Sequence, residues 1–284
     1  MKKLLRNLKF LLPVILLIAN YPLLSAPFPN QIPFQAETRY INACSDSIQK
    51  FSDDSSKIFF NNTISKTLER ILIKSESYSN NFDSLRHIGR VRSPDNKFRI
   101  ITWNLPFADG SQENFGIIQM NPYSDSTCKI FKLQDKSKNF NGDINLARFI
   151  PENWFGALYY EIFSNKAGKQ IVYTILGMHF NGFFTNKKII ESMYFDEHET
   201  PVFGRPIFEY NGQLQDRIVF EYSIDVKMIL RFDQHLNMII FDHLAPPSPL
   251  YNGNHKFYGP DFTFDGLKFE KNKWVYYPNV DYHK

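Results

Sequence analysis

Two hydrophobic periodicities divide the chain. Over residues 41–85 the apolar side chains recur at spacings of three and four, which is typical of helices with one buried face. These side chains are Ile48, Phe51, Ile58, Phe59, Ile64, Leu68, Ile71 and Leu72. The Asp-Asp-Ser run at 53–55 can cap a helix start. The pattern therefore predicts two helices, or one bent helix, over residues 41–86, packed on a larger domain.

After Arg86 the period changes to two, which is typical of strands. The runs are short, and turn signals such as the Asn-Lys-Ala-Gly segment at 165–168 separate them. They cover residues 98–103, 115–120, 157–163, 171–178, 188–195, 217–222, 227–232, 238–242, 267–269 and 274–277. Short strands joined by tight turns favour antiparallel meanders over βαβ units. We expect a mainly β (α+β) protein with an antiparallel meander sheet or sandwich over residues 87–284.

A small irregular β-propeller is the alternative fold, because several segments pair a strand, a tight turn and a strand. A propeller repeats its blade at a fixed period of about 20 to 50 residues, and the sequence contains no such period. The sheet or sandwich is therefore preferred.

The first 26 residues have the layout of a bacterial-type secretory signal. Their first part contains four basic residues, Lys2, Lys3, Arg6 and Lys9, and no acidic residue. An apolar stretch over 10–24 follows, and Ser25-Ala26 offers a signal peptidase small residues. The rival is an uncleaved anchor, but a spanning helix needs about 20 uninterrupted apolar residues, and Pro13, Asn20 and Pro22 interrupt this stretch. We expect cleavage near Ala26.

Removal of the leader would place the mature protein in the periplasm or at the cell surface, with an extended linker over 27–40. It also changes the charge. The whole chain has 33 Lys+Arg and 29 Asp+Glu, and the leader holds four of the bases, so 33 − 4 = 29 bases face 29 acids. Nucleic-acid binding needs clustered excess Lys and Arg, so no nucleic-acid partner is expected. No later apolar stretch approaches spanning length, so no transmembrane segment is expected after cleavage.

Only two cysteines occur, Cys44 and Cys128. In an exported protein such a pair can oxidise to a disulfide. The alternative is two separate buried thiols. Their separation matches neither a CxxC redox motif nor a zinc pattern, and both readings stay open.

Five segments together resemble an uncharacterised family of secreted Bacteroidetes proteins. The segments are Trp154–Tyr160, Phe203–Phe208, Phe220–Ser223, Phe241–Pro247 and Phe257–Asp261, and the resemblance covers residues 90–284. It implies a periplasmic or outer-surface setting and no particular activity. The turn at 178–182 departs from the family, which more often has an acidic, Asp-Gly-containing turn where this chain has Met-His-Phe-Asn-Gly.

The Asp242-His243 pair is the first candidate for chemistry. It ends a strand before a proline-rich loop, and loops at sheet edges often carry function. A histidine titrates near neutral pH and can act as a base or a metal ligand. Adjacent strand residues point to opposite faces, however, so the two cannot serve one substrate atom unless the strand ends between them. The structural alternative, which we favour, has both side chains bonded to backbone groups.

The acids at 261–265 are the second candidate. Asp261, Thr263 and Asp265 alternate before Gly266, as at the start of a calcium-binding loop. The match fails at the position of the bidentate glutamate, which is Asn272. A strand with its acids on the wet face is therefore the preferred reading, and these residues are weak metal candidates.

The remaining sequence patterns give weaker evidence for a functional site. The Glu-His-Glu run at 197–199 lies in an evident turn and is read as solvated. The sequence has no GxSxG, GxGxxG, P-loop, HExxH or HxH motif, and no cofactor is expected. Aromatic residues could stack on sugar rings, but in a chain this aromatic most are expected in the core. They are Trp103, Trp154, Tyr159, Tyr160, Trp274, Tyr276 and Tyr277.

These observations favour a non-catalytic binding or interaction module of the cell envelope, with a glycan or an envelope protein as its partner. The rival is a periplasmic glycan or peptidoglycan hydrolase that uses paired carboxylates. Its acids would come from Asp242, Asp261 and Asp265, with Glu161 and Glu221 in reserve. Two acids facing each other in a pocket would favour the hydrolase.

Overall fold

The computed structural model describes residues 33–122 and 127–282. Ala36–Lys284 forms one compact unit of the chain. The expected leader at 1–26 lies outside the described residues. So do residues 27–32 of the expected linker.

Two helices precede the strands. α2 spans Gln35–Lys50 and α3 spans Asp54–Leu72, and Asp53 caps α3 by accepting a hydrogen bond of 2.8 Å from the Ser56 amide. The expected linker is wrong over its last six residues, because the buried face of α2 already begins at Thr38. The helical segment also ends earlier than predicted. Beyond Leu72 the chain forms a short 3-10 helix and turns in which Tyr78, Phe82, Leu85 and Ile88 are buried.

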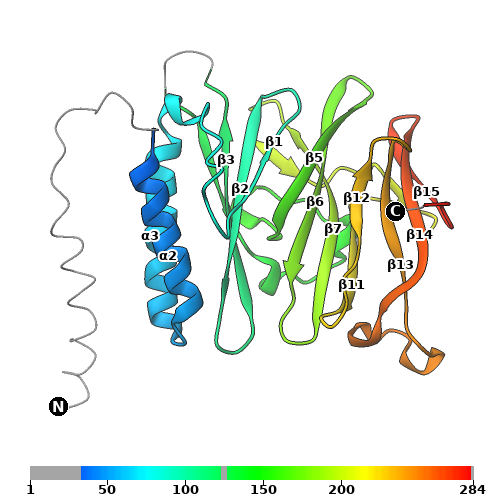
Figure 1. Cartoon of the computed structure of the whole chain (residues 1–284). Helices are drawn as coiled ribbons and strands as arrows, with labels where there is room; N and C mark the ends of the chain where they lie inside the picture. The colour runs from blue at the N-terminus through cyan, green and yellow to red at the C-terminus, as the bar shows by residue number, and fades with distance from the viewer. Residues whose placement is uncertain (1–32, 123–126, 283–284) are drawn as a thin grey trace, which may run out of the picture. The chain divides into compact units, whose positions relative to one another are not determined.

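The strands form three sheets (Figure 1). They are β1 (Gly89–Arg92), β2 (Phe98–Pro106), β3 (Gln112–Met120), β4 (Ile130–Gln134), β5 (Leu158–Ala167), β6 (Gln170–Phe180), β7 (Thr185–Phe195), β8 (Pro201–Phe203), β9 (Phe208–Tyr210), β10 (Gln213–Gln215), β11 (Arg217–Ser223), β12 (Leu230–Asp233), β13 (Met238–Ala245), β14 (Gly259–Glu270) and β15 (Lys273–Tyr277). The first sheet has the order β1-β2-β3-β4. The central sheet has the order β11-β7-β6-β5, with β8 beside β7, and the outer sheet has the order β10-β9-β15-β14-β13-β12.

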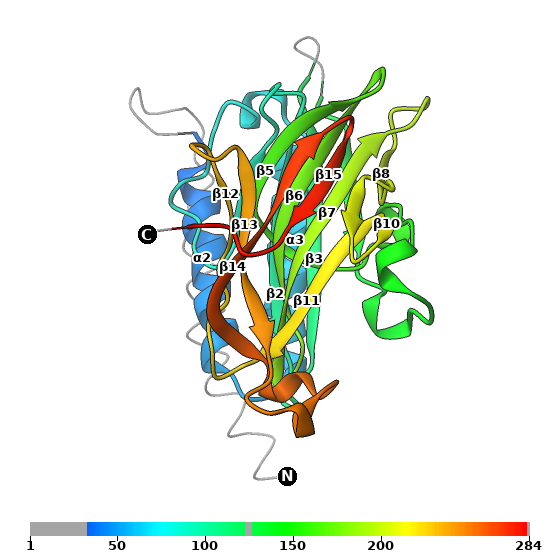
Figure 2. The same ribbon diagram turned by 90° about the vertical axis from the view of Figure 1, so that its right-hand side faces the viewer.

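The pairings are antiparallel except between β15 and β9. The predicted α+β fold with antiparallel meanders and N-terminal helices is therefore confirmed. Figure 2 shows the outer sheet in front of the central one. The sheets stack in sequence rather than surround an axis, so the propeller alternative is wrong.

Two hydrophobic cores lie on opposite faces of the central sheet. On β6, Tyr173 and Ile175 join the core shared with the first sheet, whereas Val172 and Leu176 join the core shared with the outer sheet. A sheet covered on both faces needs apolar side chains in both alternating sets. This explains why β6 is buried almost continuously from Val172 to Gly177. All three tryptophans lie in the interior, as the core reading of the aromatics expected.

The cysteines are two separate buried thiols, and the disulfide alternative is wrong. Cys44 lies on α2, and Cys128 lies just before β4. The Cys128 sulfur is 3.2 Å from the Gln119 side-chain nitrogen and donates a weak hydrogen bond to the Lys74 carbonyl at 3.7 Å. The two thiols are therefore buried at separate places in the fold.

Among the described helices, none combines the length and the apolar character that crossing a bilayer requires.

Candidate functional site

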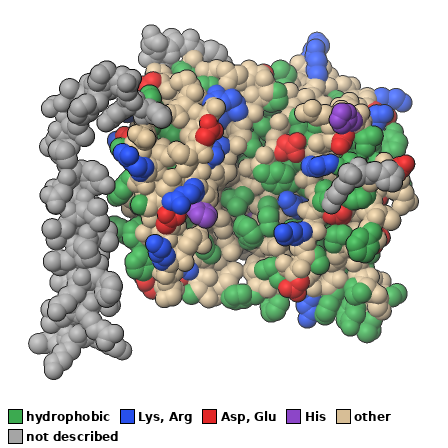
Figure 3. Space-filling model, in the orientation of Figure 1, with side chains coloured by type: hydrophobic (Ala, Val, Ile, Leu, Met, Phe, Trp, Pro, Cys, Tyr) green, Lys and Arg blue, Asp and Glu red, His purple; other side chains and the backbone are tan. Residues whose placement is uncertain are grey.

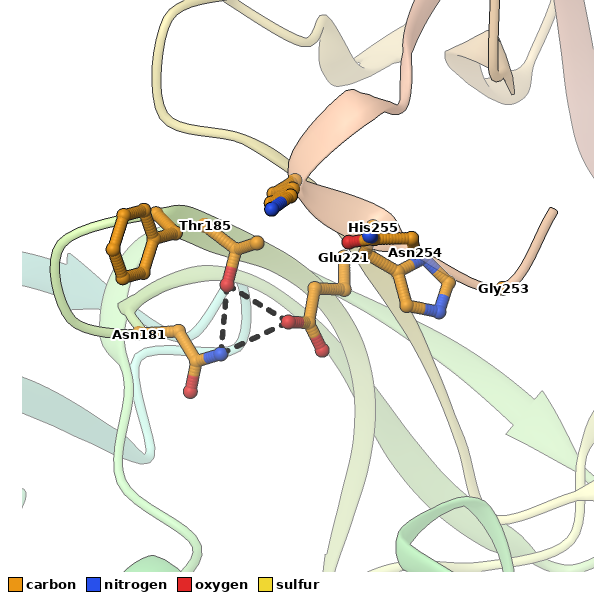
Figure 4. Close-up of a pocket in the computed structure, with 8 residues that line it drawn as sticks. Asn181, Thr185, Glu221, Gly253, Asn254 and His255 are labelled. Carbon is orange, nitrogen blue, oxygen red and sulfur yellow. Dashed lines mark hydrogen bonds between the residues drawn. The ribbon is translucent and has the colours of Figure 1, made fainter. Parts of the chain in front are cut away.

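A polar pocket of about 490 Å³ lies where three distant segments meet (Figure 4). Asn181 and Phe184 come from the β6–β7 turn, Thr185 begins β7, and Glu221 comes from β11. The opposite wall is residues 253–256, in the long connection between β13 and β14. The pocket therefore joins the ends of the central sheet to a loop of the outer sheet.

The Glu221 carboxylate is held in one orientation by the strand next to it. Its Oε1 accepts hydrogen bonds from Asn181 Nδ2 at 3.0 Å and from Thr185 Oγ1 at 2.8 Å. Lys187 Nζ lies 3.6 Å from Oε2, because Lys187 and Glu221 are cross-strand partners on β7 and β11. Asn181 Nδ2 also donates to Thr185 Oγ1 at 2.8 Å. The result is a fixed triangle of carboxylate, amide and hydroxyl (Figure 4).

The opposite wall is held through Tyr258. Its hydroxyl accepts a hydrogen bond of 3.0 Å from the Gly253 amide, and its carbonyl accepts one of 2.9 Å from the Ser223 amide. The second bond ties the loop to the end of β11. Gly253 has a φ of +79°, a conformation that glycine adopts without strain.

The pocket offers hydrogen-bonding groups of several kinds next to an apolar ring. Glu221 accepts, Lys256 donates, and the Asn181 and Asn254 side chains can do both. Phe184 lies at the rim with 68% of its surface exposed. Such a combination suits a ligand that carries hydroxyl groups and flat C–H faces.

Two residues from separate candidate sites, His243 and Asp265, come together at a different place. His243 Nδ1 lies 2.8 Å from Asp265 Oδ2, which also accepts a hydrogen bond of 2.9 Å from the Tyr276 hydroxyl. Asp265 Oδ1 accepts a hydrogen bond of 3.0 Å from the Asn279 amide. The Asp265 side chain is 3% exposed and that of His243 is 44% exposed. The carboxylate is thus an internal partner that orients a half-exposed imidazole.

Asp242 and His243 do not act together. The pairing of β13 with β14 shifts register between Asp242 and Leu244, so the alternation of faces is broken at His243. Asp242 is buried, and its Oδ2 accepts a hydrogen bond of 2.6 Å from the Ile229 amide. Its carboxylate bonds a backbone amide, as the structural alternative expected for Asp242. That alternative is wrong for His243, whose imidazole bonds the Asp265 carboxylate instead of a backbone group.

Asp261 lies at the surface on β14. Its Oδ1 accepts hydrogen bonds from the Thr263 amide at 3.0 Å and from the Thr263 hydroxyl at 2.7 Å. Partial burial by itself raises the pKa of Asp261, but the Thr263 hydrogen bonds and the nearby His243 outweigh it and leave this pKa below its ordinary value.

The three weak metal candidates have protein partners. Asp261 and Thr263 bond each other, and Asp265 bonds His243 and Tyr276. All three lie on β14, as the strand reading predicted. The expected wet face for the acids is wrong at Asp265, which is buried and bonded to His243 and Tyr276. Within residues 33–122 and 127–282 no group of three or more His, Cys, Asp or Glu side chains is placed to hold a metal ion. The Glu197–Glu199 run forms an exposed turn, as predicted.

A buried ion pair on the central sheet was not foreseen. Arg217 donates from Nε and Nη2 to Glu191 Oε1 at 2.8 and 2.6 Å. Its Nη1 donates to the Ile144 and Ala147 carbonyls at 2.6 and 2.8 Å. The Tyr159 hydroxyl donates to the other Glu191 oxygen. Both charged side chains are fully buried, so the cluster holds the 144–147 segment on the sheet rather than a ligand.

The sequence named Glu221 only as a reserve acid of the rival hydrolase, and it did not indicate the other residues of this pocket. Its residues come from three stretches that are up to 75 positions apart, between Asn181 and Lys256 (256 − 181 = 75). The only local signal was the turn at 178–182, where the chain departs from the resembled family. The other reserve acid, Glu161, accepts a hydrogen bond of 3.1 Å from the Phe232 amide.

Comparison of the chain with protein-family models, with curated proteins and with solved structures found no match.

Proposed function

We propose that the protein is an exported binding module of the cell envelope, and that the pocket around Glu221 binds sugar units of a glycan. The observation that carries the proposal is the fixed Glu221–Asn181–Thr185 triangle beside the exposed Phe184 ring. Oriented acceptors and donors can bond sugar hydroxyls, while an aromatic face covers the C–H surface of a sugar ring. Export rests on the expected leader, and the resembled secreted family agrees with it.

The rival hydrolase needs two carboxylates about 5 to 9.5 Å apart across a scissile bond. The pocket is lined by one carboxylate, that of Glu221. Asp261 and Asp265 both lie near His243, but Asp265 is buried and already accepts three hydrogen bonds. These contacts favour binding over hydrolysis.

Glycan-array binding of the protein tests this proposal. We expect selective binding to one sugar class, and an at least tenfold loss of affinity in Glu221→Gln, because hydrogen bonds to a charged group contribute about 1.5–3 kcal/mol. Glu197→Gln is the matched control, since this carboxylate lies in an exposed turn away from the pocket. Absence of binding across the array, or equal binding by Glu221→Gln, would refute the proposal. Release of reducing sugar by the wild type would favour the hydrolase.

A further inference from the structure

Four connections between elements meet at one edge of the molecule, at the bottom of Figure 1. They are the α2–α3 turn, the β2–β3 turn, the β6–β7 turn and the β13–β14 loop. The Ala108 amide donates to Asp54 Oδ1 at 2.9 Å, which joins the first two connections. The Phe183 ring lies directly over Gly110, which joins the second to the third.

The third and fourth connections are joined through the end of β11. The Ile224 amide donates to the Phe184 carbonyl at 3.0 Å, and the neighbouring Ser223 amide donates to the Tyr258 carbonyl at 2.9 Å. All layers of the fold therefore contribute to one continuous edge.

This edge exposes large apolar side chains. We define the apolar edge as Phe51, Phe59, Phe183, Phe184, Leu250 and Phe257, all of which are exposed to solvent. Phe59 near the start of α3 is 63% exposed, Phe183 in the β6–β7 turn is 61% exposed, and Leu250 in the β13–β14 loop is 83% exposed. Figure 3 shows hydrophobic side chains gathered at this edge over the β13–β14 loop. Exposed apolar patches of this kind are typical of interaction sites.

We propose that the apolar edge docks on the surface of a lipid bilayer. Its side chains come from three neighbouring connections and from the start of α3, all at one edge of the fold, which suits a planar partner. They are phenylalanine and leucine, side chains that enter the boundary between lipid headgroups and acyl chains.

The charge of the edge agrees with a bilayer. Over residues 51–59, 106–111, 181–184 and 246–258, three acids face two lysines, so the net charge is −1 with histidine neutral. The acids are Asp53, Asp54 and Asp109, and the bases are Lys57 and Lys256. A nearly neutral apolar surface matches zwitterionic lipids rather than a highly charged polymer.

Vesicle binding tests the proposal. The protein isolated from cells, so that all variants share one amino terminus, is sedimented with vesicles of phosphatidylcholine and phosphatidylethanolamine. We expect Phe59→Ser/Phe183→Ser/Leu250→Ser to lower the partition constant by at least about tenfold, the factor that insertion of a single such side chain supplies. The control is Ile171→Ser/Leu236→Ser, which removes two exposed apolar side chains at the other ends of the strands.

Hydrogen exchange with and without vesicles gives a second readout. Residues 106–111, 181–184 and 246–258 should exchange more slowly with vesicles present, and the β5–β6 turn should not change. Vesicle binding that the edge variant retains, or no vesicle binding by the wild type, would overturn the proposal. So would an edge variant that changes the oligomeric state in solution instead, because the edge would then join two copies. None of the substituted residues lines the Glu221 pocket, so glycan binding can fail or succeed separately.

Discussion

The guanidinium of Arg217 and the carboxylate of Glu191 form an ion pair on adjacent strands, with Nη2 2.6 Å from Oε1 and both side chains shielded from water. Removing one partner of such a pair leaves an uncompensated buried charge, which costs about 3–5 kcal/mol. We expect Arg217→Leu to lower the free energy of unfolding by about that amount in urea denaturation.

The double variant Arg217→Leu/Glu191→Leu should recover part of this loss, because no buried charge remains. Arg86→Leu is the control, since the Arg86–Asp46 pair is exposed and should contribute about 1 kcal/mol or less. A loss in Arg217→Leu no greater than in Arg86→Leu would contradict the expectation.

Stability should fall in mild acid because of His179. Burial lowers the pKa of His179, although a contact with the Gly156 carbonyl and the nearby Asp135 oppose the shift. The unfolded chain, with an ordinary histidine pKa of about 6.5, then binds more protons than the folded one. The contribution of neutral His179 is thus complete above about pH 6.5 and declines as pH falls from there toward the folded-state pKa.

Urea denaturation between pH 8 and 5 measures this effect. We expect His179→Gln to have a shallower loss of stability with falling pH than the wild type. His198→Gln, which changes an exposed histidine, should follow the wild-type slope. Identical slopes for His179→Gln and the wild type would show that His179 does not titrate in this way.

Gly156 should tolerate no side chain. Its φ is +83°, and a Cβ there would meet the Asp135 carboxylate, which already accepts hydrogen bonds from Asn114 and Ser137. Gly168 has a similar φ of +68° with open space around it. We expect Gly168→Ala to cost about 1–2 kcal/mol of stability from the left-handed conformation alone. Gly156→Ala should cost more in the same thermal or urea measurement, and an equal cost would contradict the contact.

The thiols should be reduced and slow to react. Burial raises the pKa of Cys44 to about 11, and it also raises the pKa of Cys128. At pH 8 we expect Ellman's reagent to label two thiols in urea and to label them far more slowly in the folded protein. Rapid labelling without urea, or an unfolded protein without titratable thiols, would be inconsistent with this arrangement.

The hydrophobic periodicities predicted the helices and strands well, because the spacing of apolar residues follows which face of each helix or strand is buried. The run at 171–178 is strand β6, and Asp53 caps α3 as its position suggested. The pairing of the sheets was not predictable, since β9 joins β15 across 66 positions between Phe208 and Trp274 (274 − 208 = 66). No spacing in the sequence indicates such a contact.

The candidate sites were likewise predictable only in part, because the sequence shows residue types but not their contacts. His243 and Asp265 could be named from their residue types, but their pairing depends on a register shift that the sequence does not reveal. Glu221 looked like an ordinary strand residue. Its place in a pocket depends on the Tyr258 contacts that bring the β13–β14 loop to β11.

Neighbouring residues on β6 bond in opposite directions. The Tyr173 hydroxyl donates to Asp95 beside the first sheet at 2.6 Å, and Thr174 Oγ1 accepts a hydrogen bond of 3.0 Å from the Trp274 indole in the outer sheet. A destabilising substitution in β6 would therefore weaken the packing of both hydrophobic cores. Substitutions in the peripheral loops should therefore be tolerated more readily than substitutions in β6, whose residues Val172–Gly177 are buried between the two neighbouring sheets.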